Sequence, residues 1–570
     1  MTTTDPTGTR PAVAWLDGTC LLPREAIGGK AWSLNRMRAL GLPAPPAFTV
    51  TTACCAEYVA AGRRLPGWLD EKVREGIRFL EADTGRRFGG AERPLLVSVR
   101  SGAAVSMPGM MDTVLDLGIN ATVERVLAGE VGSAHYAHDT HRRFVEQYRE
   151  IVLGDPGGAV PEDPWEQLWA AIAAVFDSWE SPRARAYRRN RGIDDTSGTS
   201  VTVQAMVFGN RDGRSGTGVL FSRDPSTGEG PVWGEWLVGG QGEDVVAGRV
   251  TPEPLTALAE SQPEVYARLL AAAEELERDG RDIQDIEFTV ESGTLWLLQA
   301  RSAKRTPRAA VRSAVAMAGE GLIGETEALR RVSAEQLRLL LEPELSDRHA
   351  GSALASGEAA CQGLASGQVV TDPDEAEKRA DDGDDVILVR STTSPEDFHG
   401  MLAARAVVTE LGGATSHAAV VSREIGRPCV VGCGAGTVDG LAGRDVTVDG
   451  ATGVVWAGTH AGDAIDETTM PDVLRIGEWA ARKAPLAVYR ASTFDPAQVG
   501  GYEPADLDDA GEQWRPALRA ARGARGAVLE TDEGVHAAVE AGLEFIVVEH
   551  AAPALLSAVE CVTGQERGSG

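Results

Sequence analysis

A strand–helix–strand pattern around one histidine, His417, constrains the fold of this chain more than any other feature. Residues 405–409 are apolar enough for a buried strand, and a glycine pair at 412–413 then turns the chain. Residues 417–425 carry an apolar stripe with helical spacing, and residues 429–431 read as the next strand. The pattern predicts an α/β domain in which His417 lies in the first turn of a short helix.

The ends of this helix carry clear signals, and its start suits a particular chemistry. Thr415 or Ser416 can cap the first turn, and Gly426 followed by Pro428 is a stop signal. The free N–H groups and the dipole of a helix N-terminus favour a neutral imidazole at His417, and they would stabilise an attached phosphoryl group by ~1 kcal/mol. A histidine beside two glycines is by itself only a weak sign of catalysis.

The residues around His417 strengthen that sign. The stretch GGATSHAAVVSREIGRPCVVG, residues 412–432, closely resembles the phosphohistidine signature of the family that contains pyruvate, phosphate dikinase and phosphoenolpyruvate synthase. The resemblance implies that His417 carries a phosphoryl group. It also makes Thr415 the counterpart of a threonine that is regulated by phosphorylation in some members, although a plain helix cap explains the same residue. Leu411 and Ala414 replace an arginine and a methionine of the family pattern, which could change the acceptor.

The composition describes an ordinary globular chain with an acidic bias. Its 570 residues suffice for three or four domains, and 43% hydrophobic residues leave ample core. The net charge of −29, from 55 Lys and Arg against 84 Asp and Glu, argues against nucleic acid or an anionic membrane as a partner. An anionic substrate therefore needs local clusters of Arg and Lys.

Membrane and redox signals point to the cytoplasm. The first residues after Met1, TTTDPTGTRP, are polar, and no window approaches the ~20 apolar residues of a transmembrane helix. Seven scattered cysteines fit free thiols in a reducing compartment. We interpret Cys429 and Cys433 as packing residues rather than metal ligands, and we expect a cytoplasmic protein.

Two N-terminal stretches predict a nucleotide-binding domain. Gly28-Gly29-Lys30 leads into a helix, where N–H groups and an ammonium can meet phosphates, although this signal alone is weak. Residues 95–120, LLVSVRSGAAVSMPGMMDTVLDLGIN, read as a strand that ends at Arg100 in a Ser-Gly turn, followed by a Met- and Gly-rich loop. This block closely resembles the dikinase ATP domain, which implies that Lys30 and Arg100 bind ATP phosphates. Its MMDTVLDLG ending resembles members that use phosphate rather than water as co-substrate.

Residues 133–149 hold three histidines on a predicted helix. Side chains at steps of three, as in His135, His138 and His141, fan over about 120°. We therefore do not expect them to share a metal ion. The same segment resembles the family helix whose second arginine binds inorganic phosphate, which implies that role for Arg143.

Residues 201–250 read as three strands joined by loops. The turn Ser215-Gly216-Thr217-Gly218 is a candidate phosphate cradle, because small residues let backbone N–H groups approach an anion; a β-hairpin turn is the alternative. The resemblance to the dikinases favours the cradle. It also implies further nucleotide contacts at Glu235, Gln241, Gly242, Glu243 and Asp244.

Residues 281–306 predict a hairpin with polar side chains. Strands from Asp285 to Val290 and from Thr294 to Gln299 flank a Glu-Ser-Gly turn. Strand alternation directs Glu287 and Gln299 outward on the same side of the hairpin, as paired oxygen ligands of Mg²⁺ would need. Acidic residues that alternate on a hairpin are, taken alone, more typical of a solvated face. The hairpin resembles the metal and phosphate corner of ATP-grasp enzymes. The resemblance implies Mg²⁺ at Glu287 and Gln299, and nucleotide contacts at Asp285 and Arg301.

We expect a multidomain α/β and α+β chain with three parts. These are an ATP-grasp nucleotide-binding domain at 13–345, a swivelling phosphohistidine domain at 353–457 and a short C-terminal βα region at 475–563. Polar linkers at 344–352 and 458–472 would let the middle domain visit two sites. A closed (β/α)₈ barrel needs ~200 to 250 residues, so we expect the acceptor barrel of the family to be missing, truncated or replaced.

The resemblance implies an ATP- and phosphate-dependent phosphotransferase with His417, Arg143 and Arg100 as catalytic residues. His417 would take the β-phosphoryl group of Mg²⁺-bound ATP, with release of AMP and pyrophosphate, and pass it to an acceptor. The acceptor could be pyruvate, held by a separate subunit, or another small molecule of amide, hydroxyl or antibiotic type. A non-catalytic, nucleotide-binding regulatory remnant is the alternative. The oligomeric state is open, with a homodimer as one option.

Overall fold

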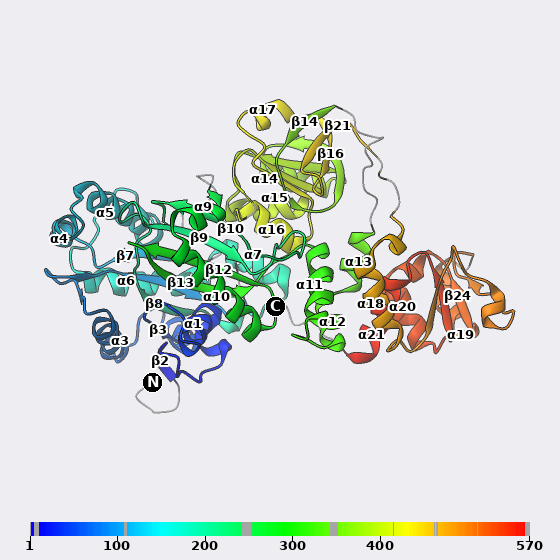
Figure 1. Ribbon diagram of the computed structural model, residues 1–570, viewed down its shortest axis with the longest axis horizontal. Helices are drawn as coiled ribbons and strands as arrows, with labels where there is room; N and C mark the ends of the chain where they lie inside the picture. Colours follow the sequence, from blue (N-terminus) through cyan, green and yellow to red (C-terminus); the bar gives the residue numbers. More distant parts are fainter. Residues whose placement is uncertain are drawn as a thin grey trace.

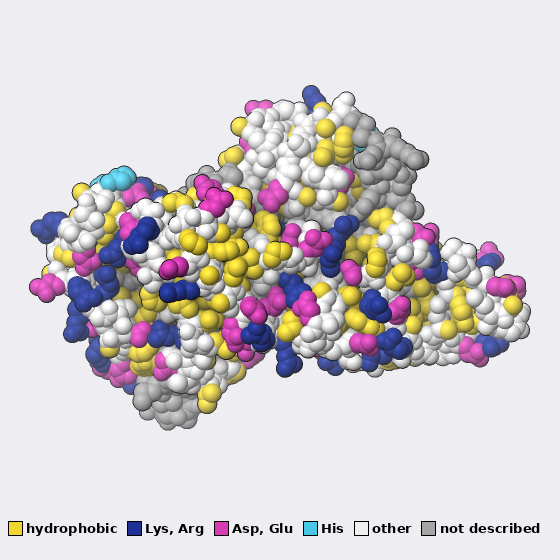
Figure 2. All heavy atoms as spheres, viewed as in Figure 1, with side chains coloured by type: hydrophobic (Ala, Val, Ile, Leu, Met, Phe, Trp, Pro, Cys, Tyr) yellow, Lys and Arg dark blue, Asp and Glu magenta, His cyan; other side chains and the backbone are white. Residues whose placement is uncertain are grey.

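The computed structural model is multidomain α/β, and it describes residues 2–4, 11–105, 107, 111–241, 252–341, 352–413, 415–460, 462, 465–509 and 511–564. Figure 1 shows an N-terminal unit (the described residues between 2 and 304), a central domain (352–457) above it and a C-terminal domain (471–564) at the right. Figure 2 shows acidic and basic side chains interspersed over one face of the molecule. Among the described residues, no helix has the length and apolarity to cross a membrane.

The first sheet of the N-terminal unit has six antiparallel strands in the order β1-β2-β3-β8-β6-β7. Its strands are β1 (Thr2–Thr4), β2 (Pro11–Trp15), β3 (Ala47–Val50), β8 (Ser200–Ala205), β6 (Val97–Gly102) and β7 (Thr113–Leu117). Short strands β4 (Arg87–Phe88) and β5 (Pro94–Leu95) pair separately. The helices of this half are α2 (Thr52–Ala60), α3 (Leu69–Thr84), α4 (Ala121–Val131), α5 (Ala134–Tyr148), α6 (Pro164–Ser178) and α7 (Pro182–Arg191).

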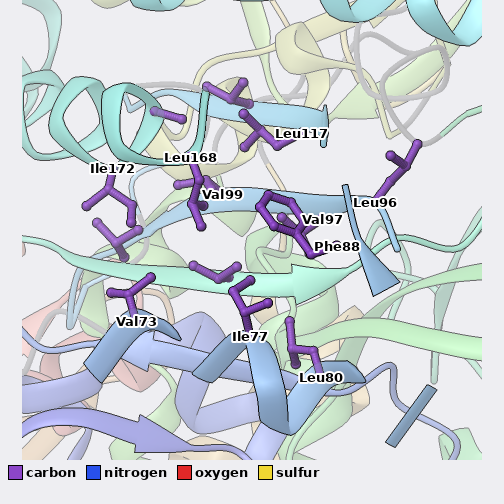
Figure 3. Close-up of a cluster of buried hydrophobic side chains, with 14 of the residues drawn as sticks. Val73, Ile77, Leu80, Phe88, Leu96, Val97, Val99, Leu117, Leu168 and Ile172 are labelled. Carbon is purple, nitrogen blue, oxygen red and sulfur yellow. The ribbon is translucent and has the colours of Figure 1, made fainter. Parts of the chain in front are cut away.

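Apolar side chains at strand and helix spacing form the core of this sheet. In Figure 3, Val97 and Val99 of β6 lie between side chains of α3 and side chains of α6. Val97 and Val99 are buried, and so are Leu80 of α3, Leu168 of α6 and the other members of this apolar cluster. Strand β6, which carries Arg100, is therefore held on a rigid, well-packed base.

The second sheet of the N-terminal unit is also antiparallel, in the order β11-β10-β9-β12-β13. Its strands are β11 (Glu253–Pro254), β10 (Trp233–Val238), β9 (Gly216–Phe221), β12 (Gln284–Glu291) and β13 (Thr294–Ser302). Helices α1 (Arg24–Ala39) and α10 (Pro263–Gly280) pack on it, and α9 (Thr256–Ser261) lies next to α10.

The central domain is built on one eight-stranded mixed sheet, in the order β14-β21-β20-β16-β17-β18-β19-β15, whose four strands β16 to β19 are parallel. Its strands are β14 (Ala353–Ser356), β15 (Glu358–Cys361), β16 (Leu364–Val370), β17 (Val386–Arg390), β18 (Ala406–Thr409), β19 (Cys429–Val431), β20 (Asp445–Asp449) and β21 (Val454–Ala457). Its helices are α14 (Pro373–Asp381), α15 (Phe398–Ala403), α16 (His417–Ile425) and α17 (Thr437–Leu441). In Figure 1, α16 lies on the side of this domain that faces the N-terminal unit.

The C-terminal domain has four parallel strands in the order β22-β25-β24-β23. They are β22 (Ala487–Arg490), β25 (Phe545–Val548), β24 (Gly523–Arg525) and β23 (Ala505–Asp506), with helices α18 (Pro471–Ala481), α19 (Trp514–Ala520), α20 (Asp532–Glu540) and α21 (Ala551–Thr563). Helices α11 (Pro307–Gly319), α12 (Glu325–Arg331) and α13 (Ala334–Leu340) share one apolar cluster with α18 and α21. From β22 onward, strands alternate with helices.

Three local expectations need correction. Strand β6 does not end at Arg100 but continues to Gly102, and β13 continues past Gln299 to Ser302, so Arg301 is a strand residue. Residues 216–218 are not a turn, because they begin strand β9. Most of the first expected linker, residues 342–351, lies outside the described residues.

Candidate active site

A backbone kink at Gly28 precedes Lys30 near the start of α1, and Lys30 lies within electrostatic range of Arg100 on the first sheet and Glu287 on the second. Gly28 has φ +79°, and a Cβ there would clash with the carbonyl oxygen of Gly102 on β6. The position therefore requires glycine. Burial lowers the pKa of the Lys30 ammonium to about 7, with a further decrease from Arg100 and an opposing effect of Glu287. A substrate that brings negative charge would restore the full charge of this lysine.

Arg100 links the two sheets of the N-terminal unit. Its guanidinium donates to Glu287 Oε2 on β12 (3.3 Å) and to Gln204 Oε1 on β8 (3.3 Å). Burial acts to raise the pKa of Glu287, but Arg100, Arg301 and Lys30 outweigh it and lower that pKa. Glu287 is thus an ionised carboxylate among three cationic side chains, as a phosphate and metal corner needs.

The hairpin β12–β13 adds further polar groups to this corner. Glu287 and Gln299 are partners in its ladder, and Arg301 Nε donates to Asp285 Oδ2 at 2.8 Å. Asp285 and Gln299 are each 5% exposed, and their Oδ1 and Oε1 atoms have no hydrogen-bond partner among the described residues. Orphaned buried oxygens are costly unless a ligand satisfies them. Two carboxylates and an amide oxygen are suitable ligands for Mg²⁺.

Glu235 joins this unit to the central domain. It lies on β10, is 7% exposed, and its carboxylate accepts a hydrogen bond from the Thr415 hydroxyl. The pKa of Glu235 is raised to about 7, mainly by burial and also by the nearby charge of Glu358. The hydrogen bond from Thr415 and the charge of Arg423 act in the opposite direction. A side chain at Gly413 would clash with the same carboxylate. The loop just before His417 is therefore in direct contact with the N-terminal unit.

His417 is the first residue of α16, as expected. Ser416 caps the helix by accepting from the Ala419 N–H at 3.5 Å, which settles the choice between the two candidate caps. Burial lowers the pKa of His417 to about 4, opposed by Asp397 and by a hydrogen bond to the Ser394 backbone. The buried Nε2 has no hydrogen-bond partner among the described residues. At neutral pH, His417 is a neutral imidazole with a free nitrogen lone pair.

The small-residue stretch 215–218 has a different role from the one expected. Residues 216–218 lie in the buried strand β9 and have ladder partners in β10 on one side and β12 on the other. Their backbone groups serve the sheet, so a phosphate cradle of backbone N–H groups is not available there. Ser215 precedes the strand, where its hydroxyl donates to Asp212 at 2.8 Å and accepts from the Ser292 N–H at 2.9 Å.

Two of the remaining predicted nucleotide and phosphate residues have hydrogen-bond partners within the N-terminal unit. Gln241 Nε2 donates to Asn210 Oδ1 at 2.9 Å. Arg143 lies on α5, where its guanidinium pairs with Asp139 at 2.8 Å. The other predicted contacts at Gly242, Glu243 and Asp244 lie outside the described residues.

Two of the three histidines of α5 have the same carboxylate partner. His138 and His141 each contact Glu124, at 3.2 Å and 2.5 Å. Among the described residues, no group of three or more His, Cys, Asp or Glu side chains is placed to hold a metal ion. All seven cysteines are free thiols, and Cys429 is fully buried, which agrees with a packing role.

Sequence reasoning missed several polar neighbours of the site. Gln204 lies in the apolar run VTVQAMV, and one amide within a buried strand was a signal that could have found it. Ser394, whose backbone hydrogen-bonds to the imidazole of His417, and Asp397, whose charge acts on it, carry no such signal. They lie about twenty residues earlier, at a short 3-10 helix (Pro395–Asp397). Only the packing of the central domain brings them together.

Two family models match this chain. The model described as "Pyruvate phosphate dikinase, AMP/ATP-binding domain" matches residues 64–268, and the model described as "PEP-utilising enzyme, mobile domain" matches residues 383–453. The first match includes Arg100, Arg143 and Glu235, and the second includes His417.

Curated relatives agree with both matches. Pyruvate, phosphate dikinase of Rhizobium meliloti is 44% identical over 84% of this chain and 60% of its own length. The enzyme of Clostridium symbiosum is 41% identical over 76% of this chain and 56% of its own length. Chloroplastic pyruvate, phosphate dikinase 1 of Arabidopsis thaliana is 41% identical over 80% of this chain and 53% of its own length. The chain thus spans somewhat more than half the length of these relatives. Over the matched regions and most of its length, the chain is thus similar to the nucleotide-binding and mobile domains of pyruvate, phosphate dikinases.

Proposed function

We propose that this chain is a dikinase-type phosphotransferase that uses ATP and inorganic phosphate to phosphorylate His417, releases AMP and pyrophosphate, and passes the phosphoryl group to a small acceptor. The observation that carries the proposal is the neutral imidazole of His417. Its Nε2 lacks a hydrogen-bond partner among the described residues, and the loop before it is bonded to Glu235 of the N-terminal unit.

The N-terminal unit would act as the ATP-grasp nucleotide domain. Lys30, Arg100 and Arg301 surround Glu287 and can spread the negative charge of a transferring phosphoryl group. Glu287 and Gln299 would hold Mg²⁺, with Asp285 beside them, and the metal would neutralise phosphate oxygens. This assignment is supported by the buried oxygens of Asp285 and Gln299 that lack a partner among the described residues.

His417 would supply the nucleophile. Its Nε2 lone pair forms a bond to the β-phosphorus of ATP, the bond between that phosphorus and the α–β bridging oxygen breaks, and AMP leaves. Inorganic phosphate, held near Arg143, then takes the terminal phosphoryl group as pyrophosphate, and one phosphoryl group remains on His417. The hydrogen bond to the Ser394 backbone would fix the ring orientation during both steps.

The central domain, residues 353–457, would then carry phospho-His417 to a second site. Pyruvate is the first acceptor to test, because the relatives named above are pyruvate, phosphate dikinases. The C-terminal domain has four strands among its described residues, fewer than a (β/α)₈ barrel. A separate acceptor subunit, or another small acceptor, therefore remains part of the proposal.

The test is mass analysis of the intact protein after incubation with Mg²⁺, ATP and phosphate. We expect one acid-labile phosphoryl group per chain, with stoichiometric AMP and pyrophosphate. His417→Ala should abolish the label, and His399→Ala should keep it, since His399 lies on the same domain and pairs with Asp374. Equal labelling of the wild type and His417→Ala would contradict the proposal.

A further inference from the structure

A second polar contact joins the two domains, at the other end of α16 from His417. The carboxylate of Glu424 accepts a hydrogen bond from the Tyr187 hydroxyl on α7, and Lys304 Nζ lies 3.7 Å from Glu424 Oε1. The side chain of Glu424 is only 5% exposed. The Tyr187 ring also packs against Phe398 of the central domain, with centroids 5.5 Å apart. The contact is therefore a buried part of the interface between the two domains.

Helix geometry links this contact to His417. Glu424 follows His417 by seven residues, which is about 20° short of two full turns and about 10 Å along the axis. The two side chains therefore lie on the same face of α16, two turns apart. When Glu424 is bound to Tyr187 and Lys304, this face of α16 is turned toward the N-terminal unit. The rigid helix transmits that orientation to the histidine.

Electrostatics agrees with this placement. Glu424 is one of the charges that act on the pKa of His417, and it also acts on Arg301 in the phosphate corner. It therefore lies within electrostatic range of both the proposed nucleophile and the proposed phosphate ligands. Lys304 follows Arg301 by three residues, just after β13. This partner of Glu424 is therefore connected to the strand that carries Arg301 of the phosphate corner.

We propose that Glu424, Tyr187 and Lys304 form a docking latch that holds the central domain with His417 turned toward the nucleotide site. The inference rests on the proposed function, because it assigns a role in phosphorylation of His417. Glu424 is a positioning residue and does not touch the reacting atoms. Such a contact suits a domain that must undock from the N-terminal unit after each phosphorylation, because water can replace its few polar partners. Interfaces between domains of one chain also resemble transient protein–protein interfaces.

The test compares Glu424→Gln and Tyr187→Phe with matched controls. Glu377→Gln removes one exposed carboxylate of the same domain on α14, and Tyr266→Phe removes one hydroxyl of the N-terminal unit on α10. Thermal unfolding of all four variants checks that each is folded. The measurements are the single-turnover rate of His417 phosphorylation, the dissociation constant for ATP, and the rate at which diethyl pyrocarbonate modifies His417, read by peptide mass analysis.

We expect each latch variant to slow His417 phosphorylation about tenfold, the effect of losing one hydrogen bond to a charged group. Each should raise modification of His417 by a similar factor, because its buried Nε2 becomes accessible. The dissociation constant for ATP should stay within about twofold. The effect of the double variant should be smaller than the product of the two single effects, because Glu424 and Tyr187 are in direct contact. The controls should behave like the wild type.

The outcomes separate the latch from the proposed function. Wild-type rates of modification and of phosphorylation in both latch variants would overturn the latch. A chain that never takes phosphate from ATP, but whose His417 becomes more reactive in Glu424→Gln, would overturn the proposed function and support the latch. Slower phosphorylation with unchanged modification would also overturn the latch, because the effect would not act through docking.

Discussion

The phosphate corner and the surroundings of His417 solve opposite electrostatic problems. In the corner, Lys30, Arg100 and Arg301 surround Glu287, so charges compensate one another within a rigid sheet. Around His417, burial instead removes the charge, and the imidazole stays neutral with its Nε2 free of partners among the described residues. The difference teaches that the groups proposed to bind phosphate and the group proposed to attack it lie on separate domains, and that each environment sets its own protonation state.

The largest expected effect comes from breaking the charge balance of the corner. Arg100→Ala and Glu287→Ala should each lower the single-turnover rate of His417 phosphorylation by ~10² or more, the scale for groups that stabilise charge in a transition state. The quenched-flow rate with Mg²⁺, ATP and phosphate measures this. Glu264→Ala, an exposed carboxylate at the start of α10, is the control. A near-normal rate in both corner variants would place the nucleotide elsewhere.

The second prediction sharpens the other side of the comparison. Because burial lowers the pKa of His417 to about 4, the imidazole remains the neutral nucleophile well below its ordinary value of 6.5. Between pH 6.5 and about 4, only the unfolded chain gains this proton, so the folded chain loses stability as the pH falls through this range. Histidine NMR signals of the full chain, assigned with His417→Ala, should show a midpoint near pH 4. A midpoint near 6.5 would mean that the ring is not desolvated.

The third prediction concerns Glu235, which touches both regions. Its pKa is raised to about 7, so the protonated form is favoured in the docked state. The contribution of protonated Glu235 to docking is complete below pH 4.5, the ordinary pKa of a glutamate, and is lost as the pH rises through about 7. Small-angle scattering should show the domains several-fold more often apart at pH 8 than at pH 6. Glu235→Gln should remove this dependence, and a pH-dependent response in that variant would refute the assignment.

The smallest effect is expected from the helix cap. Ser416→Ala removes the hydroxyl that accepts from the Ala419 N–H, which should lower the free energy of unfolding of the central domain by ~1 kcal/mol. Chemical denaturation of the full chain measures the change. Ser492→Ala, outside α16 in the C-terminal domain, serves as the control. Equal stability of the two variants would show that the cap contributes nothing.

Local signals explain what could be predicted. The glycine pair, the caps and the apolar stripe predicted a helix over 417–425 with the bounds that the structure has. The neutral state of His417 was predicted from the helix dipole, whereas burial is its largest cause in the structure. Strand alternation and a short turn predicted Glu287 and Gln299 on neighbouring strands, whereas their direct pairing depends on an irregularity in the ladder between Glu287 and Phe288.

Packing explains what could not be predicted. The glycines of β9 looked like a phosphate-binding turn, but a side chain at Gly216 would clash with the Trp236 ring, and one at Gly218 would clash with Phe288. These two rings stack with centroids 5.8 Å apart, so the glycines make room for aromatic packing. The contact of Glu424 with Tyr187 spans 237 residues of sequence and depends on how two domains meet, which local patterns do not encode.

The most direct test of the central claim follows the fate of individual phosphorus atoms. The protein is incubated with phosphate, Mg²⁺ and ATP that carries ³²P at either the β or the γ position, and His417 is then isolated in its peptide. We predict that label from the β position remains on His417 and that label from the γ position leaves in pyrophosphate. Label from the γ position on His417, with ADP as the product, would contradict the account and make the chain an ordinary histidine kinase.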